Sequence, residues 1–198
     1  MPRRYIPLLG GVVYHVTNRA RAGLVLFDSR TAYLAFIDLI IETLAVQPVR
    51  LLAFCIMSNH WHFLLWPDTD VAVRRFAGRL TMVHALRFNK LRGLSGPVYP
   101  KRFEARPVQS GASLCRVGRY IERNPCAAGL VVTPSEYPWS SAAAQGSPVP
   151  LSAWPTPRPR DWKRFIAQPV ETTELMRIRE ELKRGPQRRL RGGRGFEW

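Results

Sequence analysis

The sequence predicts an α+β fold, a ferredoxin-like sandwich in which helices pack on a central antiparallel sheet. Residues 11–18 alternate between two faces in the manner of a half-buried strand. Residues 33–44 place apolar side chains at the spacing of an amphipathic helix, and residues 50–56 and 59–66 are apolar runs that suit two paired antiparallel strands. The order strand, helix, strand, strand, helix is typical of this fold, and we expect one sheet face to remain free to present side chains.

Local signals indicate where the helices begin and end. Asp28 or Ser29 can cap the first helix, and a residue between Asp68 and Asp70 can cap the second. A third helix is expected over about residues 112–124, ended by Pro125. The outer face of the second helix is expected to be basic, with Arg74, Arg75, Arg79, Arg87 and Lys90.

The chain is long enough for one domain with a proper core, which we expect over residues 1–145. Five prolines between Pro148 and Pro159 indicate a stiff linker over residues 146–160. Residues 161–198 are expected to be helical at first and then to form a basic flexible C-terminal tail, disordered until it binds.

The charge balance favours a polyanionic partner. The chain has 30 Lys and Arg residues against 14 Asp and Glu, a formal net charge of +16. Such an excess binds polyanions through counterion release, so nucleic acid is the expected partner, and its binding should weaken as salt increases. A membrane surface would also attract this charge, but no long basic amphipathic helix carries it.

Other features favour a cytoplasmic protein without a membrane segment. The longest uncharged stretch, residues 51–67, contains Ser58, Asn59 and two histidines, which makes it a poor membrane span. The apolar residues near the start are interrupted by Pro7 and two glycines, unlike a signal peptide. The three cysteines form no C-x-x-C pair and are expected to be reduced packing residues.

The most informative motif is His60-Trp61-His62. Successive side chains of a strand point to opposite faces, so His60 and His62 share one face while Trp61 and Phe63 share the other. Two imidazoles on one face can bind a metal ion, although a pair of solvated histidines would have the same spacing. A histidine-triad nucleotide hydrolase would need a third alternating histidine, where this chain has Leu64.

A second set of chemically useful residues lies on the third predicted helix. Arg116, Tyr120 and Asn124 follow one another at four-residue spacing, so their side chains project from one face. A tyrosine hydroxyl can act as a nucleophile and an amide oxygen as a third metal ligand. Asn124 could instead cap a helix that starts at Pro125. Tyr14, Tyr99 and Tyr137 are weaker alternatives for the nucleophile.

These two sets together suit DNA strand cleavage. A divalent cation offsets the charge that develops on the scissile phosphate, while an oxygen nucleophile attacks phosphorus in line. Two neutral imidazoles and one amide leave coordination positions open for phosphate and water. Imidazole ligands also suit zinc, so the spacing alone does not identify the metal.

Several spaced motifs resemble one known family, the IS200-type single-tyrosine (HUH) transposases, and within it the branch associated with repetitive extragenic palindromes (REP). The resemblance spans about residues 5–142. Several spaced motifs in the right order identify a family more specifically than a lone H-x-H motif does. The segments that carry it are Tyr14 to Arg19, Met57 to His62, Arg87 to Asn89, Gly96 to Tyr99, Arg102-Phe103, Arg119 to Pro125, Ala128 to Val131 and Pro138 to Ser141.

The resemblance implies a central antiparallel sheet and a Mg²⁺ or Mn²⁺ cofactor held by His60 and His62. It implies that Tyr120 forms a 5′-phosphotyrosyl link with single-stranded DNA and that Asn124 is a candidate third ligand. The substrates would be imperfect palindromes that fold as hairpins. The family's tail ends in a Gly-Arg-Pro-like turn, of which Arg184-Gly185-Pro186 is a remnant here.

Further polar residues are candidates for contacts with DNA. Asn18, Arg19 and Arg21 could bind DNA beside the first strand, and Arg102 and Arg116 could hold phosphates. Phe103 or Tyr99 could stack on an unpaired base, although ordinary packing is the simpler expectation. We expect His15 to be a structural histidine outside the metal set, and His84 to be a core residue.

The sequence thus supports a metal-dependent transposase that cleaves and rejoins hairpin-forming single-stranded DNA. The alternative is a non-catalytic DNA-binding protein or repressor derived from such an enzyme. Either a monomer or a homodimer could form the site, because a dimer could exchange the helix that carries Tyr120.

Overall fold

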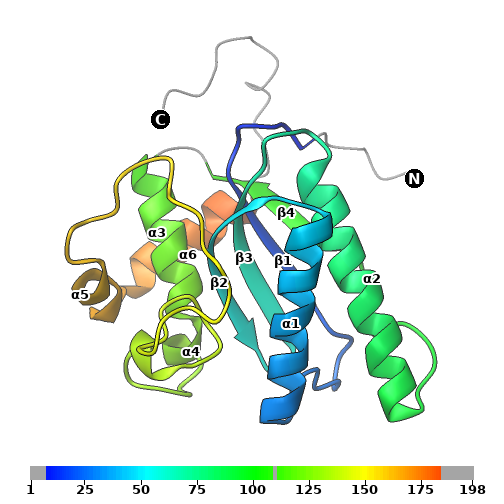
Figure 1. Ribbon diagram of the computed structural model, residues 1–198. Coiled ribbons are helices and arrows are strands. Elements are labelled where there is room, and N and C mark those ends of the chain that lie inside the picture. The colour runs from blue at the N-terminus through cyan, green and yellow to red at the C-terminus, as the bar shows by residue number, and fades with distance from the viewer. Residues whose placement is uncertain (1–7, 109–110, 184–198) are drawn as a thin grey trace.

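The computed structural model describes residues 8–108 and 111–183, and an antiparallel sheet lies at its centre (Figure 1). The sheet has the strand order β2-β3-β1-β4, and each neighbouring pair is antiparallel. Its strands are β1 (Tyr14–Arg19), β2 (Arg50–Met57), β3 (His60–Trp66) and β4 (Glu104–Pro107). The α+β fold with a central antiparallel sheet is therefore confirmed.

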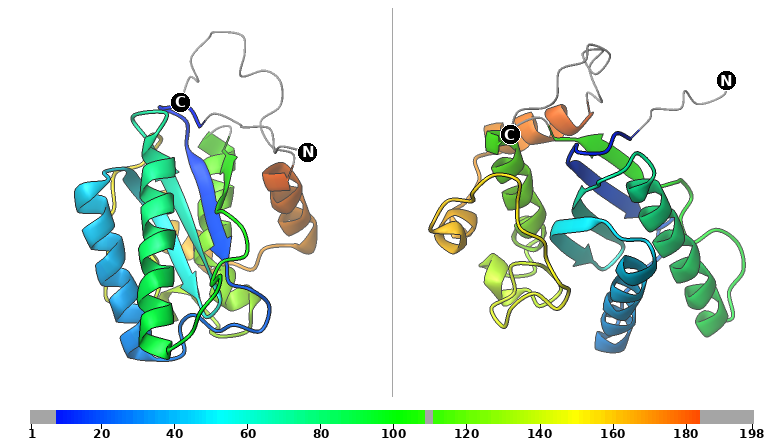
Figure 2. Two further views of the ribbon diagram at one scale, coloured as in Figure 1. Left: turned by 90° about the vertical axis from the view of Figure 1, so that its right-hand side faces the viewer. Right: turned by 45° about the horizontal axis from the view of Figure 1, so that its top comes forward.

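Helices cover both faces of this sheet (Figure 2). The long helices α1 (Arg30–Val46) and α2 (Ala72–Arg92) pack on one face, whereas α3 (Gly111–Glu122) and α6 (Thr172–Lys183) pack on the other. Two hydrophobic clusters result, one on each side of the sheet. The expectation that one sheet face remains free is wrong, because α3 and residues after it pack on that face.

The two long helices begin differently. The Ser29 hydroxyl accepts a hydrogen bond from the backbone nitrogen of Ala32 and caps α1, as the sequence predicts. The expected cap of α2 between Asp68 and Asp70 is wrong, because Val71 occupies that position without a capping side chain. Asp70 instead accepts a hydrogen bond from the backbone nitrogen of Gly10, while Asp68 forms an ion pair with Arg50.

The third helix is followed at once by a short one. α3 ends at Glu122, and the chain forms α4 over Asn124–Ala127. Pro125, which was expected to stop the third helix, lies in the first turn of α4, where its missing N–H costs no helical hydrogen bond.

The proline-rich residues 146–160 lie against the sheet. The backbone nitrogen of Ser152 donates to the Leu51 carbonyl, and the Trp154 indole donates to the Leu52 carbonyl at 3.0 Å. Beyond them, Arg119 of α3 and Arg123, which follows α3, donate to carbonyls at and after the end of α5 (Trp162–Ala167). The division into domain, linker and tail stays a prediction, and the basic tail from residue 184 lies outside the described residues.

Within residues 8–108 and 111–183, no helix is both long enough and apolar enough to cross a bilayer.

Candidate active site

The register of the sheet brings the histidines to the face that α3 covers. Arg19 of β1 pairs with His60 of β3, and Thr17 pairs with His62. The rings of His60 and His62 have centroids 4.9 Å apart and are nearly perpendicular. His60 is partly exposed, whereas His62 has only 6% of its surface exposed. The alternation of the motif therefore places both imidazoles on one face, as expected from the sequence.

Both imidazoles have one nitrogen engaged and the other available. The Nδ1 atom of His60 lies 2.7 Å from Oδ1 of Asn59, an acceptor, so this nitrogen donates and Nε2 keeps its lone pair. The Nδ1 atom of His62 lies 2.8 Å from Nε2 of His15. His62 Nε2 is buried and has no hydrogen-bond partner. Buried polar atoms usually have a partner, and a metal ion could supply one for this nitrogen.

The surroundings keep these histidines neutral. Burial, reinforced by the charge of Arg19, lowers the pKa of His60 to about 4. Burial also lowers the pKa of His62 well below its ordinary value, with further contributions from His15, His60 and Arg19. Because these pKa values are lowered, both side chains are neutral at pH 7. A neutral imidazole is the form that binds a metal.

Tyr120 of α3 lies beside this pair. Its ring centroid is 6.0 Å from that of His62 and 6.1 Å from that of His15, and it meets both rings edge-on. Its side chain is partly exposed. Tyr120 and the histidines belong to the same chain, so one chain brings the nucleophile candidate to the metal-ligand candidates.

The three alternative tyrosines have structural roles instead. Tyr14 accepts a hydrogen bond from the backbone nitrogen of Leu9, and Tyr137 donates to the Ile56 carbonyl. The hydroxyl of Tyr99 bonds with the indole of Trp61 and with His84. Each has less than a tenth of its surface exposed.

Asn124 follows Tyr120 by one helical turn. Its amide nitrogen donates to the carbonyl of Tyr120 at 2.9 Å, so Oδ1 is the atom of this side chain that could bind a metal. The N-cap of α4 is Arg123, so the alternative of Asn124 as that cap is wrong. Arg116, one turn before Tyr120, donates to the hydroxyl of Ser113.

The candidate DNA contacts fall into two groups. Arg19, Arg21 and Arg102 are exposed. Asn18 has only 5% of its surface exposed, and its Oδ1 accepts a hydrogen bond from the backbone nitrogen of Arg19. Asn18 is thus placed to hold the backbone at the end of β1 rather than to face solvent.

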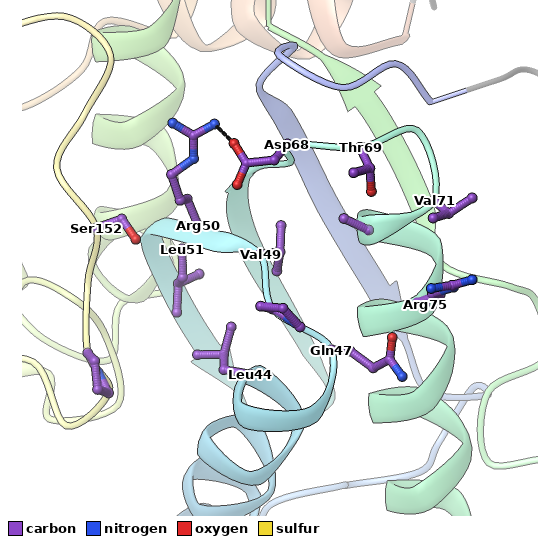
Figure 3. Close-up of a pocket in the computed structure, with 13 residues that line it drawn as sticks. Leu44, Gln47, Val49, Arg50, Leu51, Asp68, Thr69, Val71, Arg75 and Ser152 are labelled. Carbon is purple, nitrogen blue, oxygen red and sulfur yellow. Dashed lines mark hydrogen bonds and ion pairs between the residues drawn. The ribbon is translucent and has the colours of Figure 1, made fainter.

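The pocket in Figure 3 lies away from this site. It has a volume of about 440 Å³ and is lined by residues that include Arg50, Asp68 and Arg75. Arg50 pairs with Trp66 at the end of β3, whereas His60 begins that strand. A larger groove of about 780 Å³ runs along α2 and includes Arg102, but its lining contains neither histidine of the motif.

No cluster of three or more His, Cys, Asp or Glu side chains among the described residues is arranged to hold a metal. The contact of His15 with His62 was not expected from the sequence. Only the pairing of β1 with β3 reveals it, because that register decides which residues of the two strands become neighbours.

Comparison with known proteins places the chain in a family. The family model described as "Transposase IS200 like" matches residues 11–124. No protein with a curated description matches the chain.

The solved structures that are similar to it include the following two. A REP-associated tyrosine transposase bound to a REP hairpin is 20% identical with a TM-score of 0.59, over 71% of this chain and 82% of its own. A protein from Deinococcus radiodurans R1 described as a "putative transposase" is 19% identical with a TM-score of 0.41, over 62% of this chain and 95% of its own. The first similarity shows the fold. Because the family model matches more than half of the chain, the protein belongs to the IS200-like transposase family.

Proposed function

We propose that this transposase cleaves and rejoins hairpin-forming single-stranded DNA through a covalent bond to Tyr120. Family membership assigns the chain to DNA transposition, and the single observation that carries the finer proposal is the position of Tyr120. Its ring centroid lies 6.0 Å from that of His62, and the Nε2 atom of His62 is buried without a hydrogen-bond partner. A binding protein without catalysis has no need for this combination.

The substrate class follows from charge and from the structural relative. A chain with a net charge of +16 favours nucleic acid, and the similar solved structure was obtained with a REP hairpin. We propose REP-like palindromes as the substrates. Arg19 and Arg21 are exposed at and just after the end of β1, the strand end that faces His60, where they can hold phosphates.

The donor atoms fit a divalent metal. The Nε2 atoms of His60 and His62 and Oδ1 of Asn124 would hold Mg²⁺ or Mn²⁺, and the unpartnered His62 Nε2 is the observation that supports this fit. When bound, the ion would withdraw negative charge from the scissile phosphate.

The chain's own residues then carry the strand transfer. The hydroxyl oxygen of Tyr120 bonds to phosphorus and loses its proton, while the bond from phosphorus to the 3′ oxygen breaks. The 3′ oxygen takes up a proton and leaves as a hydroxyl, so the 5′ end stays attached to the protein. Attack by another 3′ hydroxyl reverses these bond changes and releases Tyr120, so the phosphodiester is rejoined without an external energy source.

We further propose that Tyr120 acts together with the two histidines of its own chain. Mixing a Tyr120→Phe protein with a His62→Ala protein tests this. Neither variant nor the mixture should cleave if the site lies within one chain. Restored cleavage in the mixture would show instead that two chains exchange the α3 helix.

The proposed activity itself is tested with a Tyr120→Phe variant on end-labelled hairpin oligonucleotides, taken from palindromes that flank the gene, in Mg²⁺ or Mn²⁺. Cleavage should be lost while binding is retained. Tyr33→Phe is a matched control, because this α1 tyrosine loses only one long hydrogen bond, 3.3 Å to Tyr137. Binding without cleavage by the unaltered protein in either metal would support the DNA-binding regulator.

A further inference from the structure

We propose that His15 is a positioning residue for the metal site. It accepts a hydrogen bond from Nδ1–H of His62 and thereby leaves a free lone pair on His62 Nε2. This inference rests on the proposed function, since it concerns how His62 becomes a ligand. His15 is not proposed to contact metal or DNA.

The two histidines are in direct contact, and both are buried. Nε2 of His15 lies 2.8 Å from Nδ1 of His62, and the rings lie 13° from parallel with centroids 5.1 Å apart. Both side chains are buried, with 5% and 6% of their surfaces exposed. Water therefore has little access with which to replace this hydrogen bond, and the two tautomers of each ring are coupled to one another.

One proton lies between the two nitrogens, and its owner decides whether His62 can bind a metal. If His15 donates, the neutral His62 carries its proton on Nε2, and that atom becomes a buried N–H without a partner. If His62 donates from Nδ1, its Nε2 keeps a lone pair that could bind a metal. Only the second arrangement allows ligation, and metal ligands in proteins commonly donate their other ring N–H to such an acceptor.

The sheet explains why His15 is the partner. His62 pairs directly with Thr17, and His15 stands two residues before Thr17 on the same face of β1. The Thr17 hydroxyl donates to the backbone carbonyl of Trp61 at 2.7 Å, so it is turned away from the imidazole. The diagonal neighbour His15 is then the side chain that reaches Nδ1.

The environment of His15 suits an acceptor. Arg106 of β4 pairs with His15 in the sheet, and its positive charge disfavours a second positive charge on the imidazole. A neutral imidazole at this position has one ring nitrogen with a lone pair that can accept the Nδ1–H of His62.

The tautomer is measurable without any activity assay. In full-length apo protein labelled with ¹⁵N, long-range proton–nitrogen correlation spectra distinguish protonated from unprotonated imidazole nitrogens. We expect His62 to be protonated at Nδ1 and His15 to be unprotonated at Nε2. A His62 protonated at Nε2 would overturn the proposal, and this result does not depend on how any variant folds.

Metal affinity provides the second test, with Mn²⁺ titrated by calorimetry. His15→Phe keeps a ring in the site but removes the acceptor, and should weaken Mn²⁺ binding about 10–100-fold. His15→Gln can place an amide oxygen near the former Nε2 and should recover much of that loss. His84→Phe is the matched control, because His84 is another buried histidine, bonded to Tyr99 on the other side of the sheet.

The outcomes separate the two proposals. Unchanged Mn²⁺ affinity in His15→Phe, or equal losses in His15→Phe and His84→Phe, would overturn the role of His15 while leaving the metal site intact. A Gln variant as weak as the Phe variant would also count against it. Absence of Mn²⁺ binding by the unaltered protein would contradict the metal site itself, and the role of His15 with it.

Discussion

Replacing Gly118 by alanine tests the packing that holds the helix of Tyr120. A Cβ atom at this position would lie 2.3 Å from Cη2 of the Trp154 ring and 3.1 Å from its Cζ2. Carbon atoms in contact are normally about 3.5–4.0 Å apart, so the ring or α3 must move by about 1 Å. The indole is anchored by its hydrogen bond to the Leu52 carbonyl and by an edge contact with Trp162.

The expected cost follows from these contacts. Overpacking costs about 1–3 kcal/mol, and loss of the indole hydrogen bond adds about 1 kcal/mol. The better helix propensity of alanine returns about 1 kcal/mol. We therefore expect Gly118→Ala to lower the free energy of unfolding by about 1–3 kcal/mol, measured as a shift of the midpoint in urea at constant slope.

Two comparisons make this test decisive. In a Trp154→Leu background the clash is relieved, so Gly118→Ala should become neutral or stabilise by up to about 1 kcal/mol. Gly78 of α2 has open space around its Cβ position, and Gly78→Ala should stabilise by a similar amount. If Gly118→Ala instead stabilised the unaltered protein as much as Gly78→Ala, the result would show that Trp154 does not pack against Gly118 of α3.

Three further predictions concern other parts of the molecule. Burial lowers the pKa of His84 to about 4, so between about pH 6.5 and 4 the unfolded chain binds more protons than the folded one. The free energy of unfolding therefore falls as the pH falls through that window. His84→Gln should lose about 3 kcal/mol less of this free energy than the unaltered protein, measured by urea unfolding at each pH. Glu122 accepts hydrogen bonds from the Ser141 hydroxyl and the Trp162 indole, and Ser141 can also donate to the Phe54 carbonyl. Glu122→Leu should therefore leave the indole unpaired and cost about 1–3 kcal/mol in the same assay, and an unchanged midpoint would contradict this role. Arg19→Ala should weaken hairpin binding and reduce the slope of log affinity against log salt by about 0.7–1, whereas an unchanged slope would place this arginine away from the phosphates.

Elements with a strong local pattern could be predicted from the sequence. The apolar spacing of residues 33–44 lies within α1, and the Ser29 cap forms as expected. The two apolar runs at residues 50–56 and 59–66 are the paired strands β2 and β3. In these segments, side-chain periodicity and burial point to the same structure.

Features that depend on distant partners could not be predicted. The aspartates before α2 look like caps, but Asp70 and Asp68 are engaged by Gly10 and Arg50 instead. β4 was not expected, because a four-residue edge strand that contains Pro107 has little strand signal of its own.

The candidate site shows the same limit. Alternation along the strand is enough to place His60 and His62 on one face, and helical spacing is enough to place Tyr120 and Asn124 one turn apart. The contact of His62 with His15 depends on the register of β1 against β3, which the sequence does not specify. The burial of His62 depends on α3, whose place over the sheet is likewise a tertiary feature.

The covalent bond that we propose between Tyr120 and DNA can be measured directly. The method is mass spectrometry of peptides from the protein after reaction with a hairpin oligonucleotide in Mn²⁺ and digestion of both partners. We expect a nucleotide attached through its 5′ phosphate to the peptide that contains Tyr120, and none in a His60→Ala and His62→Ala double variant. A nucleotide on a different tyrosine, or cleaved DNA without any protein-linked nucleotide, would contradict it.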